Sequence, residues 1–309
     1  MRIRVQIVLS LLALAACVLA VGFSAASFTD TVQNPQTATA IADWVGPSAS
    51  SSVIAKTPGA VSGYVKENGS YFVYANVADS GNPASGISSV TASVSSITTG
   101  QTAVPLVAGS YSTGGVSYNY RSAELKAKSS LSAGTKNYTL TMEDAAKNKT
   151  EGQSFSVVVD NGPFKGSDFE TANTSGGTEG KPEKGDSVIF TFNEVVDPNS
   201  IVSGWTGSGT KPVTVSITDS AANDNLLVSG ATIGSVALKG DFTTGTTTFS
   251  SSSISVSGST VTIVLGTSSG SPKEAGKVKP VWTPSASNYD RAGNASSTTT
   301  ITGGNEKQF

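Results

Sequence analysis

The sequence predicts an all-β protein of two consecutive β-sandwich modules behind an N-terminal export segment. The chain of 309 residues contains 33 glycines and is rich in serine, threonine and valine, a composition that favours strands and turns over helices. After residue 30 the apolar residues alternate with a period of two. Glycine or proline interrupts every stretch longer than about ten residues, so no helix is expected.

Composition also excludes several classes of function. The chain has no histidine, so it has no Ser-His-Asp triad and no imidazole metal ligand. Its single cysteine, Cys17, permits neither an intramolecular disulfide nor a thiolate zinc site. The net charge of −2 and the presence of only four arginines argue against nucleic-acid binding.

Residues 1–26 have the form of a bacterial signal peptide. Arg2 and Arg4 precede an apolar run over residues 5–26 that ends in small residues. We therefore expect a secreted or cell-surface protein from which this segment is cleaved. There are two alternatives: residues 5–26 are retained as a membrane anchor, or Cys17 carries a lipid, because the four residues that end there resemble a lipobox.

Residues 27–52 are expected to connect this segment to the first module. Residues 46–52 (Gly-Pro-Ser-Ala-Ser-Ser-Ser) predict a flexible linker. The run Phe-Thr-Asp-Thr at residues 28–31 resembles the start of secreted fibre-forming and camelysin-like proteins. This resemblance implies an alternative, a fibre subunit in which residues 28–39 add as a strand to a neighbour's open sheet edge.

The first module is predicted over residues 53–161. In its strand at residues 71–79, the odd-numbered side chains from Tyr71 to Val77 share one face and are core candidates. Further strands are predicted at residues 87–94, 116–120, 138–142 and 153–161.

Two motifs in this module carry a resemblance. Leu131, a glycine-containing turn and Tyr138 resemble the tyrosine corner of immunoglobulin-like and fibronectin type III sandwiches. The turn at residues 144–148 (Asp-Ala-Ala-Lys-Asn) lies between two strands, as in the bacterial Ig-like repeats of secreted surface proteins. The usual turn of those repeats is Asp-x-Ala-Gly-Asn, and this chain departs from it at Lys147. The resemblance implies an Ig-like fold and leaves the function open.

The second module is predicted over residues 164–303, with residues 304–309 as a tail. Residues 290–294 give the full Asp-x-Ala-Gly-Asn turn, which indicates a second copy of the same architecture. The strands at residues 253–256 and 260–265 are expected to form a hairpin. The other strands are predicted at residues 188–192, 212–218 and 278–282.

Carboxylates are the remaining candidates for chemistry. Glu194 and Asp197 follow a strand, and a carboxylate pair can hydrolyse glycosides, but a solvated strand end is the simpler interpretation. Five aspartates lie at predicted strand ends or turns, where oxygen ligands for calcium could converge as in cadherin-like junctions. No clustered Asp-x-Asp-x-Asp loop is present, so each is expected to satisfy its own turn backbone. These aspartates are Asp79, Asp144, Asp160, Asp197 and Asp290.

Aromatic residues suggest two possible contact surfaces. Seven of the eight tyrosines lie between Tyr64 and Tyr138, and an exposed group of them could bind a glycan or a protein. Alternation along the strands is expected to bury about half of them. Trp205, in the loop Gly-Trp-Thr-Gly, is the best single candidate for an exposed contact, although packing in the core is the expected outcome.

The sequence therefore predicts an exported protein with a structural, adhesive or binding role and no catalysis. No catalytic, cofactor-binding or metal-binding residue is assigned. The expected partner is a protein or glycan at the cell surface. The alternatives are the fibre subunit and a carbohydrate-binding or carboxylate-only glycoside-acting protein.

Overall fold

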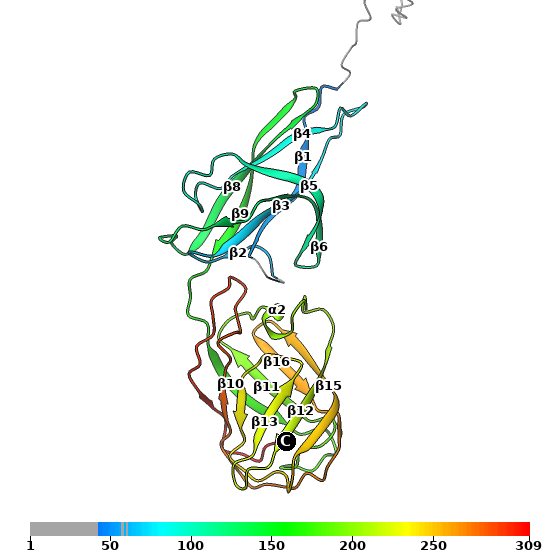
Figure 1. Cartoon of the computed structure of the whole chain (residues 1–309), viewed down its shortest axis with the longest axis vertical. Coiled ribbons are helices and arrows are strands. Elements are labelled where there is room, and N and C mark those ends of the chain that lie inside the picture. The colour runs from blue at the N-terminus through cyan, green and yellow to red at the C-terminus, as the bar shows by residue number, and fades with distance from the viewer. Residues whose placement is uncertain (1–42, 57–58, 60) are drawn as a thin grey trace, which may run out of the picture. The chain divides into compact units, whose positions relative to one another are not determined.

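Strands dominate the protein, and each of its two sheets is built from a continuous part of the sequence (Figure 1). The computed structural model describes residues 43–56, 59 and 61–309. The predictions for the signal segment, Cys17 and residues 28–39 therefore lie outside the described residues. Both sheets belong to one compact unit, residues 42–309.

The first sheet contains nine strands in the order β1-β3-β6-β5-β4-β8-β9-β2, with β7 paired to β3. The pairings are antiparallel except that of β2 with β9. β5 pairs with β4 at its beginning and with β6 over the rest, so the sheet folds into two layers. The strands are β1 (Ser48–Lys56), β2 (Tyr64–Val65), β3 (Ser70–Ala78), β4 (Ile87–Ser93), β5 (Val104–Thr113), β6 (Val116–Ser122), β7 (Leu125–Lys126), β8 (Gly134–Asp144) and β9 (Lys149–Val159).

Alternation explains how this module builds its core. Tyr71 and Val73 of β3 are buried on one face, as the sequence predicts, and they pack in one cluster with Leu140 and Met142 of β8. Tyr138 is also buried, and its hydroxyl shares a hydrogen bond with the Ser52 hydroxyl at 3.0 Å. This differs from the tyrosine corner, in which the hydroxyl bonds to the backbone a few residues upstream.

The second sheet contains ten strands in the order β10-β11-β16-β15-β12-β13-β14-β18-β19, with β17 paired to β15. β10 and β19, the two ends of this order, contact each other, so the sheet curves back on itself. The expected hairpin is confirmed as β15 and β16. The strands are β10 (Gly166–Ala172), β11 (Ser187–Phe192), β12 (Lys211–Thr218), β13 (Asn225–Ser229), β14 (Ser235–Ala237), β15 (Thr247–Ser257), β16 (Thr260–Val264), β17 (Thr267–Ser268), β18 (Val281–Thr283) and β19 (Ile301–Thr302).

Aromatic rings fill the second core. Val188, Phe190 and Phe192 of β11 are buried on one face, as predicted, while Ile189 on the other face is only partly buried. Trp282 of β18 contacts the rings of Phe190 and Phe192 edge-on, with ring centroids 5.1 and 5.2 Å away. Such edge-to-face contacts add to the free energy gained from burial of the rings.

One short helix corrects the expectation of a helix-free chain. The helix α2 (Pro198–Ile201) follows Asp197, whose carboxylate accepts a hydrogen bond from the Asn199 N–H. Proline at the first helical position has a backbone angle that suits a helix and lacks only an N–H that would be unpaired there. Period-two alternation could not reveal this helix, because local capping rather than an apolar face specifies it.

The segments expected to be a linker before the first module and a tail after the second also take part in the fold. Residues 48–52, expected to be linker, lie in β1, where the backbone pairs with β3. The serine-rich composition misled the prediction because the pairing depends on backbone hydrogen bonds and not on apolar side chains. In the expected tail, Phe309 is buried against Phe242 at a centroid distance of 5.5 Å.

Within residues 43–56, 59 and 61–309, no helix is both long enough and apolar enough to cross a bilayer.

Candidate functional site

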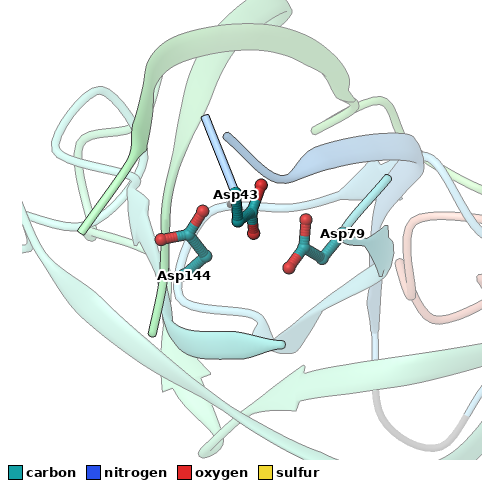
Figure 2. Close-up of side chains that lie close together, drawn as sticks. All are labelled: Asp43, Asp79 and Asp144. Carbon is teal, nitrogen blue, oxygen red and sulfur yellow. The ribbon is translucent and has the colours of Figure 1, made fainter. Parts of the chain in front are cut away.

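The first candidate site is a cluster of three aspartates at one end of the first module, called here the first carboxylate cluster. Asp43 lies just before β1, Asp79 follows β3, and Asp144 ends β8. One carboxylate oxygen of each lies within 4.8 Å of the others. Figure 2 shows that the three side chains approach one another from separate segments of the backbone. Asp43 and Asp144 are buried and Asp79 is partly buried.

Backbone N–H groups hold these carboxylates in place. Asp43 accepts hydrogen bonds from Val45 at 3.1 Å and Ser85 at 2.8 Å. Asp79 accepts from the backbone of the 80–86 turn. The pKa of Asp43 is lowered below its usual value by hydrogen bonds. The largest contribution comes from the Ser85 side chain, followed by the backbone N–H groups of Ser85 and Val45. The turn therefore favours an ionised carboxylate at this position.

The second carboxylate cluster is Asp160, Glu194 and Asp290, whose oxygens also lie within 4.8 Å of one another. Asp160 lies between β9 and β10, Glu194 follows β11, and Asp290 begins the Asp-x-Ala-Gly-Asn turn. Asp43 and Asp160 each precede the first strand of a module. The two clusters therefore draw their acids from corresponding positions of the two modules.

In each cluster an asparagine side chain links an aspartate carboxylate to a backbone carbonyl of the segment before the module, an arrangement called here the clamp. In the first, Asp144 accepts hydrogen bonds from the Asn148 N–H and Nδ2, both at 2.8 Å, and Asn148 Nδ2 also donates to the Asp43 carbonyl at 3.1 Å. In the second, Asp290 accepts from the Asn294 N–H and Nδ2 at 2.8 Å, and Asn294 Nδ2 donates to the Asp160 carbonyl at 2.9 Å. The Asp–Asn turn thus fixes the chain segment that leads into its own module.

The second clamp has additional backbone donors. The Asp290 carboxylate also accepts from the N–H groups of Ala292 at 2.8 Å and Gly293 at 2.6 Å. Gly293 has φ of +97°, a conformation that glycine adopts without a steric penalty. In the first module Lys147 stands at this position with φ of +74°. The Ala-Lys departure therefore keeps the turn and places a non-glycine residue in the left-handed region.

The two clusters differ in charge. Arg291 Nη2 lies 3.6 Å from Asp160, and the guanidinium also stacks over the Tyr64 ring at 4.2 Å. Burial, followed by the charges of Asp160 and Asp290, raises the pKa of Glu194. In the first cluster, no lysine or arginine of the described residues lies within ion-pairing distance of the three aspartates.

Converging carboxylates of this kind are hard oxygen ligands, which suit Ca²⁺. Each cluster contributes three of the six to eight oxygens that Ca²⁺ takes. Four of the five aspartates named from the sequence fall into these clusters: Asp79, Asp144, Asp160 and Asp290. Sequence reasoning missed Asp43. The signal that could have found it is its position before a module, which matches that of Asp160.

The structure gives Glu194 and Asp197 different partners. Glu194 joins the second carboxylate cluster. Asp197 is buried, caps α2 and forms an ion pair with Lys56. Glu194 therefore lies among two other carboxylates, whereas the Asp197 carboxylate is engaged by the start of a helix and by a lysine.

The structure places Trp205 and about half of the clustered tyrosines in the core, which is the outcome that the sequence favours. Trp205 is 1% exposed, and its indole N–H donates to the Ser208 carbonyl at 3.1 Å, so it is a core residue and not a surface contact. Core packing is the expected outcome for this residue, because the indole ring is large enough to reach the core from a loop. Four of the seven clustered tyrosines are also buried, namely Tyr71, Tyr74, Tyr118 and Tyr138.

Comparison with known proteins gives no match to a family model, a curated protein or a solved structure.

Proposed function

We propose that the chain is an exported, non-catalytic protein of the cell surface or extracellular space, in which Ig-like modules have a structural or adhesive role. The observation that carries this proposal is the clamp that occurs twice. Each clamp ties the chain segment before a module to a turn within that module. An internal duplication of this kind suits a protein that holds successive modules in a defined order.

Two features support the Ig-like assignment within this proposal. The first module has two layers joined by a strand that changes partner, β5. The Asp–Asn turn recurs between strands in the first module and near the end of the second. The clamps also require no disulfide, which agrees with a chain whose single cysteine lies in the expected export segment.

Export is tested by N-terminal mass analysis of the protein isolated from the cells that produce it. Cleavage after residue 26 should give a mature chain that begins at Ser27. Lipid on Cys17, or a retained anchor over residues 5–26, gives a different mass and identifies the corresponding form of attachment. A cytosolic protein that still begins at Met1 contradicts the proposal.

The structural or adhesive role is tested on cells that lack the protein. These cells should attach less well, or have a weaker surface layer, and the wild-type chain should restore the loss. Glu194→Gln should restore it equally well and leave any detected sugar hydrolysis unchanged, because no catalysis is involved. Restoration by wild type but not by Glu194→Gln, together with a loss of sugar hydrolysis, favours the glycoside-acting alternative.

The fibre alternative has its own test. Deletion of residues 28–39 should abolish polymerisation of the exported chain if that segment adds as a strand to a neighbour. Polymerisation that is unchanged by the deletion, or absent in the intact chain, removes the alternative.

A further inference from the structure

A cavity of about 510 Å³ lies beside helix α2. Lys56, Lys66 and Ser70 of the first module line it, together with residues around α2 and the Asp290–Asn294 turn of the second. Its volume lies within the range of pockets that hold small ligands, about 300 to 1,000 Å³.

One of the two lysines that line the cavity has no carboxylate of the described residues at ion-pairing distance. Lys56 forms a buried ion pair with Asp197. Lys66 also lines the cavity and is partly buried, but within the described chain no carboxylate lies at ion-pairing distance from its amine. An anionic group of a ligand could fill this role.

Polar groups without a hydrogen-bond partner among the described residues line the cavity together with Lys66. Within the described residues, the hydroxyls of Ser70, Ser203 and Ser287 make no hydrogen bond to the protein. The side-chain oxygen Oδ1 of Asn199 accepts a hydrogen bond from the Gly204 N–H at 2.7 Å. The side-chain nitrogen Nδ2 of this lining residue is therefore left to donate to a ligand. These groups can both donate to and accept from the hydroxyls of a ligand.

An aromatic ring completes the lining. Tyr289 is 39% exposed, yet its backbone is fixed on both sides, because its N–H donates to the Ser200 hydroxyl at 3.0 Å and its carbonyl accepts from the Asp197 N–H at 2.8 Å. An exposed ring on a backbone held in this way offers a flat apolar surface next to polar groups. The C–H face of a sugar ring can pack on such a surface.

We propose that this cavity binds a saccharide that carries a carboxylate, with the carboxylate at Lys66, the sugar ring on Tyr289 and the sugar hydroxyls at the serine and asparagine groups. The inference rests on the proposed adhesive role, for which it names a ligand class. Export and attachment are measured separately, so failure of the saccharide proposal leaves those results unaffected.

The test is a calorimetric titration of the full mature chain with glucuronic acid, with glucose as the uncharged control and acetate as the control for charge alone. Glucuronic acid should bind more tightly than either control. Lys66→Gln should weaken its binding about tenfold, a factor that corresponds to about 1.4 kcal/mol. Lys66→Arg should keep most of the affinity, and Tyr289→Ala should weaken binding of both sugars.

Lys211→Gln is the matched control, because Lys211 is also partly buried and has no ion pair among the described residues, but lies outside the cavity lining. This variant should bind glucuronic acid as the wild type does. Thermal melting of every variant verifies that it is folded. Absence of saturable glucuronic acid binding, equal binding of acetate, or loss of affinity in Lys211→Gln as large as in Lys66→Gln overturns the proposal.

Discussion

In the first carboxylate cluster, Asp43, Asp79 and Asp144 converge without a lysine or arginine of the described residues at ion-pairing distance. In the second, Arg291 lies beside Asp160 and the pKa of Glu194 is raised. The buried aspartate and the asparagine of the clamp are common to both. What varies is the means by which like charges at close range are balanced.

The comparison separates two roles of the clustered carboxylates, namely accepting hydrogen bonds from the backbone and adding negative charge to the cluster. Hydrogen bonding to the backbone is the role of Asp144 and Asp290, and it requires no ion. Asp79 in the first cluster and Glu194 in the second each add a further carboxylate. In the second cluster Arg291, beside Asp160, balances part of the negative charge. In the first cluster the balance falls to solvent or to a bound cation.

The largest effect is expected from removal of the clamp aspartates. Asp290→Ala leaves four donors without their acceptor and should lower the free energy of unfolding by about 3 to 5 kcal/mol, whereas Asp144→Ala leaves two and should cost about 2 to 3 kcal/mol. Urea unfolding measures both. Tryptophan fluorescence reports on the second module, which contains the buried Trp205 and Trp282. Equal losses in the two variants contradict the difference between the clamps.

The stabilisation by Ca²⁺ should depend more on the first carboxylate cluster than on the second, because the two clusters differ in charge. Raising Ca²⁺ from a chelated solution to ten times its Kd should stabilise the protein by about 1.4 kcal/mol per occupied site, seen as a higher melting temperature. Asp79→Asn should remove more of this gain than Glu194→Gln, because Arg291 already balances part of the second cluster's charge. Mg²⁺ is the control, since it prefers a smaller octahedral set of ligands. A wild-type melting temperature that is the same with Ca²⁺ and with chelator shows that neither cluster holds the ion.

Substitution of the clamp asparagines should lower the free energy of unfolding by less than substitution of the clamp aspartates. Asn148→Ala and Asn294→Ala each remove side-chain hydrogen bonds to an aspartate and to a backbone carbonyl, and should each cost about 1 kcal/mol. The first should make the segment before β1 easier to cleave by protease, and the second the segment between β9 and β10. Mass spectrometry of the early fragments locates the cuts. Cuts at the same sites in both variants argue against local clamps.

The smallest effect concerns the pH dependence of Glu194. Its pKa is raised in the folded protein, so the folded state takes up this proton more readily than the unfolded state. The contribution of Glu194 to stability therefore declines as pH rises from its ordinary value near 4.5 through the raised value. In chelator at pH 7, Glu194→Gln should raise stability by less than about 1 kcal/mol, and the gain should vanish below pH 4. A lower stability of this variant at pH 7 without Ca²⁺ contradicts the repulsion.

Local pattern was sufficient for many strands. In β3 and β11 the odd- or even-numbered side chains predicted for the core are buried, although Tyr74 on the other face of β3 is buried as well. The β15–β16 hairpin forms where its turn predicts. These predictions succeed because side chains alternate along any extended backbone, whatever the rest of the fold does. The same period could not identify β1, where small polar residues pair with β3.

By itself the sequence determined the all-β class, the alternating core faces and the recurrence of the Asp–Asn turn, because each depends on residues close together in the chain. Only the tertiary structure decided that Asp43 meets Asp79 and Asp144, that Glu194 lies with Asp160 and Asp290, and that Trp205 is buried. Those outcomes depend on strand order and register, which are set by packing between distant segments. A carboxylate at a strand end is visible in the sequence, but its neighbours across the sheet are not.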